Sequence, residues 1–223
     1  MTKALFTQAI TKFFLGVLLT GLLVFLPAGT WAFFNGWLLM GVLFLPMLLV
    51  GIVLFIKHPT LLEKRLKSKE SQSEQGLLVK LSGLMFLAGF VAAGLDFRFR
   101  WFPLPRGLSI CAAGAFLLAY LLYAEVLREN AYLSRIIEVQ EDQQVIDTGL
   151  YAIVRHPMYS ATVLLFLSIP LILGSLISFF IFLLYLPLIA KRIRAEEAFL
   201  TAELAGYAAY IQKVRYRLIP FIW

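Results

Sequence analysis

Residues 149–159, GLYAIVRHPMY, stand between two apolar segments and combine an arginine, a histidine, a proline and two tyrosines. Pro157 suits the first turn of a helix, where a missing N–H costs no hydrogen bond. The chain is therefore predicted to bend at His156 and to enter a membrane helix at Met158. The free amides of that helix start, with Arg155 and His156, would bind a carboxylate or a phosphate. Anchoring of the helix end at lipid headgroups is the alternative.

The segments on either side of this motif are apolar enough to lie in a membrane. The 223-residue chain is 61% hydrophobic, and its mean hydropathy is +0.86, which is typical of a polytopic membrane protein. About twenty apolar residues cross the hydrocarbon core of a bilayer. Four such segments precede the motif, near residues 13–33, 37–56, 77–95 and 107–127.

The apolar block after the motif, from Tyr159 to Ala190, is interrupted at Gly174-Ser175. Two helices joined by a tight turn account for its length, whereas one tilted helix is disfavoured because the block is too long for a single crossing. The sequence therefore predicts an all-α fold. It is a polytopic membrane helical bundle of about six transmembrane helices, the last two forming a hairpin, with a cytosolic C-terminal tail.

The basic residues predict the orientation of this bundle. Six crossings that start in the cytoplasm place all but three of the 20 basic residues on that side, the exceptions being Arg98, Arg100 and Arg106. Cytoplasmic loops of membrane proteins carry such an excess of lysine and arginine. Both termini, the motif and the tail are therefore predicted to face the cytoplasm.

Polar side chains are unevenly distributed along the chain. Before Glu125 they concentrate in a solvated connector, residues 57–76, whereas after Glu125 they are frequent up to the motif. We expect a single membrane domain over residues 1–223. Within it, residues 1–124 form helices of unassigned role, and residues 125–223 carry the function.

The net charge of +7 bears on the partners of the protein. Because the basic residues flank apolar segments, anionic membrane lipids explain them better than nucleic acid does, and no base-reading motif accompanies them. The oligomeric state is open, since small residues such as Gly83, Gly89 and Gly94 pack helices within one chain or between two.

Several kinds of site are disfavoured. One cysteine, Cys111, rules out a disulfide framework, and two histidines, His58 and His156, argue against a zinc site, so no metal is expected. No Gly-x-Gly-x-x-Gly, P-loop, Gly-x-Ser-x-Gly or His-Glu-x-x-His motif occurs, which argues against a doubly wound nucleotide domain, common hydrolases and zinc proteases. An adenosine cofactor would have to be held by helices and loops.

A second polar cluster, KRIRAEE at residues 191–197, follows the last apolar run. Arg192 and Glu196 are four residues apart and share a helix face, which Tyr207 and Tyr210 would join if Gly206 does not end the helix first. An ordinary surface turn held by salt bridges is one interpretation. The other gives the glutamates an ammonium to pair with and the arginine a carboxylate.

The third cluster closes the chain, where tyrosines alternate with basic residues between Tyr207 and Arg217. Such a segment is typical of an anchor at the membrane surface. It would equally serve as a lid that folds over a cofactor arriving from the cytosol.

Together these clusters resemble the integral-membrane methyltransferases of the isoprenylcysteine carboxyl methyltransferase family, which are related to phospholipid N-methyltransferases. The matching residues are Gly149-x-Tyr151, Val154-Arg155-His156-Pro157-x-Tyr159, a helical hairpin, Glu196-Glu197-x-x-Leu200, Gly206-Tyr207-x-x-Tyr210 and Pro220, preceded by Asn130-x-Tyr132-x-Ser134-Arg135 and residues 140–145. The resemblance covers about residues 125–223. Leu150 departs from the family pattern, in which many members have proline.

The family binds S-adenosylmethionine in a cytosol-facing pocket built from this half, so the resemblance implies roles for individual residues. Arg192 would orient a substrate carboxylate, and Glu196 or Glu197 would face the methionine ammonium or the sulfonium. Arg155 or His156 would lie near the methionine carboxylate. The residues implied in cofactor binding are Gln140, Gly149, Tyr151, Val154, Arg155, His156, Pro157, Tyr159, Glu196, Tyr207 and Tyr210.

The resemblance implies an S-adenosylmethionine-dependent methyltransferase that acts at the cytoplasmic face on a lipidic or prenylated substrate, small molecule or protein. Carboxyl O-methylation is favoured because a carboxylate is ionised at pH 7 and needs no general base. N-methylation of an amine or phospholipid headgroup needs a base, which Glu196 or Glu197 could supply. A membrane sterol-type reductase and a non-enzymatic scaffold or small transporter are further alternatives.

Overall fold

The computed structural model describes residues 3–66, 73–134 and 138–223, and in these residues the chain is helical with no β-sheet. The first half contains α1 (Lys3–Ala28), α2 (Phe34–Lys57), α3 (Pro59–Leu66), α4 (Ser73–Phe99) and α5 (Arg106–Glu129). The second half contains the 3₁₀ turn η1 (Gly149–Ala152), then α6 (Pro157–Leu173), α7 (Leu176–Phe182), α8 (Tyr185–Glu203) and α9 (Tyr207–Lys213). The predicted all-α class is confirmed.

Five helices of the described chain are long and apolar enough to cross a membrane, namely α1, α2, α4 from Gly76, α5, and the nearly continuous α7–α8 run Leu176–Glu203. The sixth apolar helix, α6, is shorter. It begins at Pro157, one residue before the predicted Met158 and with proline in the first turn, and ends at Gly174, whose left-handed backbone (φ +76°) turns the chain back. Ser175 caps α7 by accepting a hydrogen bond from the Ser178 amide. The polytopic bundle with a final hairpin is therefore confirmed.

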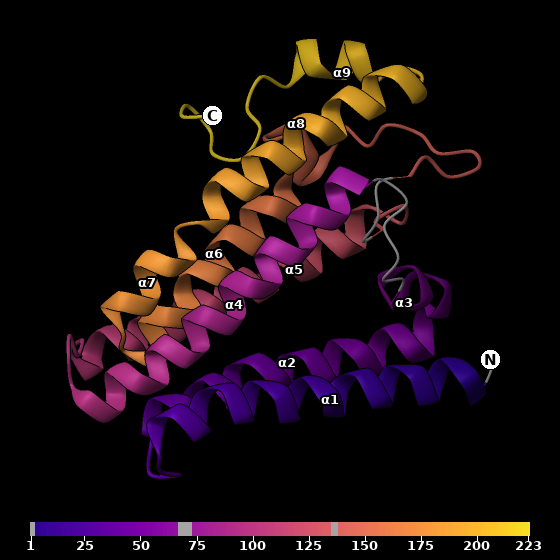
Figure 1. The fold of residues 1–223 in the computed structure, drawn as a ribbon. Coiled ribbons are helices and arrows are strands. Elements are labelled where there is room, and N and C mark those ends of the chain that lie inside the picture. Colours follow the sequence, from indigo (N-terminus) through magenta and orange to yellow (C-terminus); the bar gives the residue numbers. More distant parts are fainter. Residues whose placement is uncertain (1–2, 67–72, 135–137) are drawn as a thin grey trace.

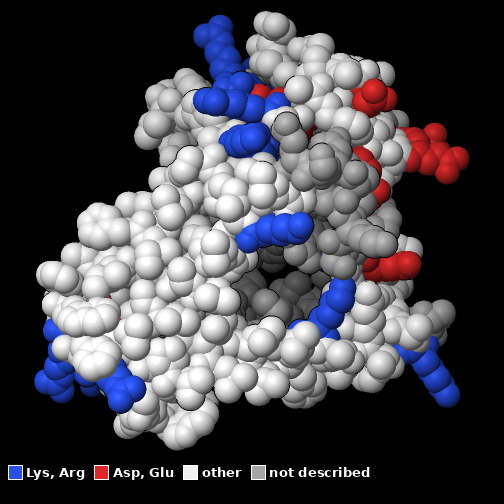
Figure 2. All heavy atoms as spheres, in the orientation of Figure 1, with Lys and Arg blue, Asp and Glu red and all other residues white. Residues whose placement is uncertain are grey.

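The helices form two groups that diverge toward one end of the molecule. Figure 1 shows α1 and α2 side by side, touching the remaining helices at one end and separating from them toward α3. Figure 2 shows a hollow between the α1–α2 pair and α4, with basic side chains at its rim. Much of the surface in this view is free of charge, as expected for helices that face lipid.

The end of the bundle opposite α9 is closed by polar contacts inside an apolar core. Asp96 of α4 is buried and accepts hydrogen bonds from Ser175 Oγ at 2.5 Å and from the Phe102 amide at 2.8 Å. Close by, the Gly89 carbonyl oxygen of α4 accepts a hydrogen bond from Ser178 Oγ. These bonds fix the hairpin turn against α4 and thereby position α6 and α8 for the other end.

Two of the glycines of α4 that suggested close helix packing make their contacts within the chain. A Cβ on Gly89 would lie 2.3 Å from the buried ring of Phe182 in α7, and a Cβ on Gly94 would lie 2.6 Å from the Val24 carbonyl oxygen of α1. A Cβ added to Gly83 would meet no atom within 4 Å. Helix α4 can therefore approach α1 and α7 only because these two residues have no side chain.

Gly94→Ala is expected to lower the free energy of unfolding by about 1–3 kcal/mol, because the added methyl meets α1 backbone, which cannot rotate away. Thermal unfolding in detergent checks this. Gly114→Ala is the matched control, since a Cβ at Gly114 in α5 meets nothing within 4 Å. An unchanged thermal midpoint in the Gly94 variant would contradict the close α1–α4 contact.

Candidate active site

The C-terminal tail docks on the segment that leads into α6. The amides of Arg155 and His156 donate to the carbonyl oxygens of Tyr216 and Arg217 at 2.8 and 2.9 Å. The Arg155 side chain adds two bonds to the Val214 and Arg215 carbonyls at 2.7 and 2.8 Å. The amides just before Pro157 are therefore used by the tail, and the site is built from both segments.

Glu197 of α8 holds this docking together. Its carboxylate accepts hydrogen bonds from Arg155 Nε at 2.6 Å and from Arg217 Nε at 2.8 Å, and His156 Nε2 lies 3.2 Å away. Only 6% of Glu197 is exposed, and a buried carboxylate is stable only when it is paired in this way. Its geometry is that of an anchor between α8, the motif and the tail.

At the exposed end of the tail, Lys213 Nζ lies 2.6 Å from Asp147 Oδ2, which joins α9 to the loop before η1. The hydrogen bond from Lys213 lowers the pKa of the Asp147 carboxyl. Both side chains are exposed, so this pair adds little to stability. It marks the place where the tail closes over the loop.

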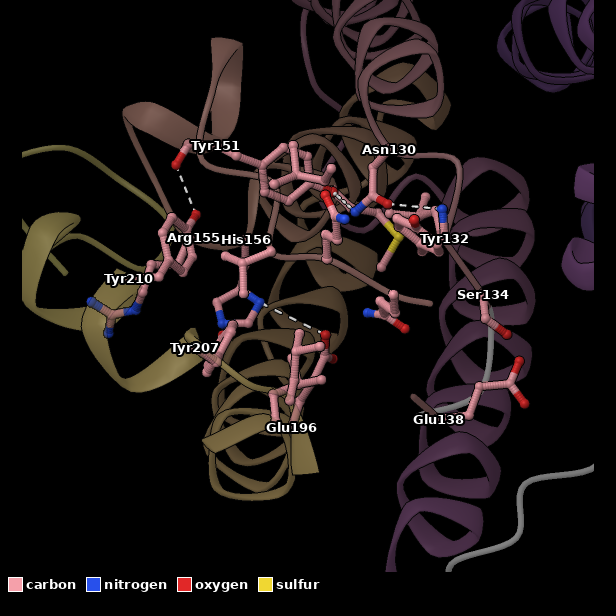
Figure 3. Close-up of a pocket in the computed structure, with 18 of the residues that line it drawn as sticks. Asn130, Tyr132, Ser134, Glu138, Tyr151, Arg155, His156, Glu196, Tyr207 and Tyr210 are labelled. Atoms are coloured by element: carbon pink, nitrogen blue, oxygen red, sulfur yellow. Dashed lines mark hydrogen bonds and ion pairs between the residues drawn. The ribbon is translucent and has the colours of Figure 1, made fainter. Parts of the chain in front are cut away.

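A cavity lies beneath this closure, and we call it the polar cavity. It encloses about 830 Å³ of empty space, which includes open solvent at its mouth. Figure 3 shows His156, Tyr207 and Tyr210 at one side and Ser134 and Glu138 at the other. Its described lining consists of Asn130, Tyr132, Leu133, Ser134, Glu138, Gln143, Gln144, Val145, Ile146, Tyr151, Arg155, His156, Met158, Tyr159, Arg192, Glu196, Leu200, Leu204, Tyr207 and Tyr210.

A chain of hydrogen bonds connects α6 and α8 at the inner end of the polar cavity. Tyr159 Oη donates to Glu196 Oε2 at 2.5 Å and accepts from Arg192 Nε at 3.1 Å. His156 Nδ1 lies 3.9 Å from Glu196 Oε1. The predicted Arg192–Glu196 face is thus present, with the Tyr159 hydroxyl between the two charges, and Glu196 presents a carboxylate to the cavity.

The opposite wall is fixed by tyrosines. Tyr151 Oη accepts from Asn130 Nδ2 at 3.0 Å, and its carbonyl oxygen accepts from Tyr210 Oη at 2.7 Å. Burial raises the pKa of both phenols, so they remain neutral at physiological pH. These bonds tie the end of α5, η1 and α9 into one wall.

Tyr207 differs from its neighbours because its hydroxyl is buried without a hydrogen-bond partner among the described residues. The side chain lines the polar cavity and is 5% exposed. Burial, and then the charges of Glu196 and Glu197, raise the pKa of its phenol, which therefore stays a neutral O–H donor. A buried unpaired hydroxyl costs about 1–3 kcal/mol, so this donor points to a ligand that accepts its hydrogen bond.

A second, apolar cavity meets the polar one, and we call it the groove. It encloses about 1070 Å³ of empty space, part of it open. Its described lining consists of Arg65, Leu78, Val79, Ser82, Gly83, Phe86, Met158, Tyr159, Thr162, Phe166, Tyr185, Leu188, Ile189 and Arg192. Met158, Tyr159 and Arg192 line both cavities. A polar and an apolar compartment therefore meet at these three side chains.

The structure brings together most of the site residues that the sequence singled out. Those that line the polar cavity are Tyr151, Arg155, His156, Tyr159, Arg192, Glu196, Tyr207 and Tyr210. Arg155 lines the cavity, but its guanidinium is already hydrogen-bonded to Glu197 and to the Val214 carbonyl of the tail. Helix α8 ends before Gly206, whose φ is +85°, so the tyrosine pair belongs to α9 and faces the cavity from another direction.

Other singled-out residues lie outside the cavity lining. Gln140 instead donates to the Tyr132 carbonyl at 2.6 Å. Gly149 forms a left-handed turn (φ +54°) against the Glu129 carboxylate, where any Cβ would clash. Val154 is buried and Pro157 begins α6. Glu197 is also outside the described lining, and the predicted contact of these residues with a cofactor stays a prediction.

Sequence reasoning did not commit to several cavity residues, among them Asn130, Tyr132, Glu138 and Gln143. The available signal was the polar segment Asn130-x-Tyr132-x-Ser134 upstream of the motif. It carries no periodicity, because residues 130–134 and 138–148 are largely irregular loop. Arg65 was missed entirely, and two of its hydrogen-bond partners, Tyr123 and Ser134, lie 58 and 69 residues away in the sequence.

Comparison with known proteins agrees with this geometry. The model of the Isoprenylcysteine carboxyl methyltransferase (ICMT) family matches residues 109–202, from α5 through the hairpin almost to the end of α8. A search of curated proteins finds no match. The matched range contains Tyr151, His156, Tyr159, Arg192 and Glu196 of the polar cavity. Residues 109–202 are therefore similar to the isoprenylcysteine carboxyl methyltransferase family, and this match supports the activity of a membrane methyltransferase.

Proposed function

We propose that the protein transfers the methyl group of S-adenosylmethionine to the carboxylate of a lipidic or prenylated substrate at the cytoplasmic membrane face. The observation that carries the proposal is the meeting of the polar cavity and the groove at Met158, Tyr159 and Arg192. A water-soluble cofactor and a membrane-soluble substrate need compartments of these two kinds that share a boundary. Catalysis of methyl transfer consists mainly of aligning the two reactants.

The polar cavity suits S-adenosylmethionine in its donor and acceptor groups. Glu196 offers a carboxylate for the methionine ammonium and for the field of the sulfonium. The unpaired hydroxyl of Tyr207 offers a donor for an oxygen of the cofactor. When bound, the cofactor supplies an electrophilic methyl group, and the walls around Tyr151 and Tyr210 exclude water from it.

The groove suits the acceptor. Arg192 lies where the groove meets the polar cavity, and a substrate carboxylate held there by its guanidinium would face the cofactor. The hydroxyl of Tyr159 fixes Arg192 from one side. A new ester bond forms between a carboxylate oxygen and the methyl carbon as the carbon–sulfur bond breaks, and S-adenosylhomocysteine leaves. No proton has to be removed.

N-methylation of an amine is supported less well. Glu196 is a carboxylate of the polar cavity that could accept a proton, but its Oε2 accepts a hydrogen bond from Tyr159. The two charged side chains in the described part of the groove lining are both arginines, and they would repel an ammonium group. The family match favours methyl transfer over a reductase or a non-enzymatic role.

Calorimetry of detergent-solubilised protein with S-adenosylhomocysteine tests the cofactor part of the proposal. We expect one site with micromolar affinity in the intact protein. Absence of heat at concentrations where the protein is folded and monodisperse would contradict it, because the polar cavity is proposed to be formed without substrate.

Tyr207→Phe is expected to weaken S-adenosylhomocysteine binding by about fivefold to tenfold, since it removes one hydrogen bond to the ligand. The thermal midpoint should stay the same or rise, because the hydroxyl has no partner in the described protein. Tyr216→Phe is the control, as this tyrosine is outside the cavity lining. A Tyr207 variant with unaltered affinity would show that its hydroxyl does not bind the cofactor.

A further inference from the structure

Helix α3 is the only described element of the first half that reaches the groove with a charged side chain. It packs on the end of α5 and on the segment that follows through Leu61, whose buried cluster includes Val126 and Leu133. Figure 1 shows α3 at the end where the α1–α2 pair diverges from the other helices. The packing of this short helix brings Arg65 into the groove lining, where it contacts the boundary residue Met158.

The Arg65 guanidinium contacts only neutral groups among the described residues. It donates to the Tyr123 hydroxyl, to the Ser134 carbonyl at 3.4 Å and, at 3.8 Å, to the sulfur of Met158. Its carbon Cζ also lies 5.5 Å from the centre of the Tyr123 ring. These contacts hold the guanidinium in place without neutralising its charge.

The surroundings make that charge expensive. The described groove lining is otherwise apolar or neutral, and Arg192 adds a second positive charge but no carboxylate is present. A guanidinium that contacts only neutral groups beside an apolar cavity at the membrane end is costly in the empty protein. An anion that enters the groove would form charge-assisted hydrogen bonds with it.

We propose that Arg65 is a substrate-binding residue that acts with Arg192 to recognise the anionic end of an amphiphile whose apolar part lies in the groove. This inference rests on the proposed function and explains how the site would select its substrate by the charge of the headgroup. The pair favours a carboxylate over a neutral or cationic headgroup. It also gives the first half of the chain a role in the site, through α3.

The test uses the full chain in detergent and two ligands of nearly equal shape, N-acetyl-S-farnesylcysteine and its carboxamide. For intact protein we expect the acid to bind at least about tenfold more tightly than the amide, since hydrogen bonds to charged groups are the stronger ones. In Arg65→Gln this ratio should fall about tenfold, with S-adenosylhomocysteine affinity unchanged. In turnover the same variant should raise KM for the acid more than it lowers kcat.

Arg128→Gln is the matched control, because Arg128 is on the exposed end of α5 and pairs with Glu125. An acid-to-amide ratio that stays the same in Arg65→Gln overturns the inference. If Arg65→Gln has a lower thermal midpoint or no longer binds S-adenosylhomocysteine, the Arg65→Lys variant becomes the test of the inference. It keeps the charge but loses the guanidinium fork, so a ratio reduced about threefold supports the inference and an unchanged ratio overturns it.

The outcomes separate this inference from the proposed function. Binding of the acid that depends on Arg65, without methyl transfer, would leave the inference standing and the proposed function refuted. Methyl transfer to the acid that is the same in the intact protein and in Arg65→Gln would support the proposed function and refute the inference. Failure of intact protein to bind the acid would overturn both.

Discussion

Glu197→Gln is expected to lower the free energy of unfolding by about 3–5 kcal/mol, because removing one charge of a buried ion-pair network leaves its partners uncompensated. The partners are Arg155 and Arg217, which share the Glu197 carboxylate. The tail docks through these contacts, so its release should accompany the loss of stability. The thermal midpoint in detergent measures the first effect, and faster trypsin cleavage at Arg215 and Arg217 measures the second.

Glu196→Gln is the control for this prediction, since it makes the same chemical change one residue away. Glu196 is partly exposed to the polar cavity and bonds to Tyr159. We expect a change in stability of about 1 kcal/mol or less, together with weaker S-adenosylhomocysteine binding. Equal thermal midpoints in the two glutamine variants would contradict the division of roles between the two glutamates.

Arg192→Gln is expected to reduce kcat/KM for methyl transfer by about two to three orders of magnitude, the usual effect of removing a group that orients charge at the reaction centre. Arg192 lines both cavities and bonds to the Tyr159 hydroxyl. Affinity for S-adenosylhomocysteine should change much less, because Arg192 is proposed to hold the acceptor.

Arg194→Gln provides the comparison for the Arg192 variant. Arg194 is on the same helix, but its side chain is exposed and lines neither cavity. Its variant should keep full activity. A kcat/KM that is equally reduced at both positions would point to a general electrostatic effect of the α8 end and would contradict a specific role of Arg192.

The helical elements of the second half followed closely from local sequence. Pro157 at the first turn of α6 and Gly174 at its end have the backbone geometry that their residue types favour. The shared face of Arg192 and Glu196 followed from helix periodicity. Such features depend on a few neighbouring residues, so a single sequence is sufficient to predict them.

The different roles of Glu196 and Glu197 did not follow from the sequence. Adjacent residues on a helix point about 100° apart, and which of them meets the tail depends on where Arg217 docks. The role of Arg65 depends likewise on the packing of α3 against a segment far along the chain. Tertiary contacts of this range leave no local pattern.

The structure explains why Leu150 can stand where many members of the family have proline. Its amide donates to the Glu129 carboxylate at 2.9 and 3.2 Å, a bond that proline at this position would lack. The turn at Gly149 is therefore held by Glu129 in this chain. The departure changes how the turn is fixed and removes no side chain from the polar cavity.

The most direct test of the central claim is methyl transfer by purified protein in lipid vesicles that contain both phosphatidylethanolamine and N-acetyl-S-farnesylcysteine. With methyl-labelled S-adenosylmethionine, we predict label on the farnesylcysteine that mild base releases as methanol, the behaviour of an ester. Base-stable label on phosphatidylethanolamine would contradict carboxyl methylation, and absence of transfer to either acceptor would contradict the proposed substrate class.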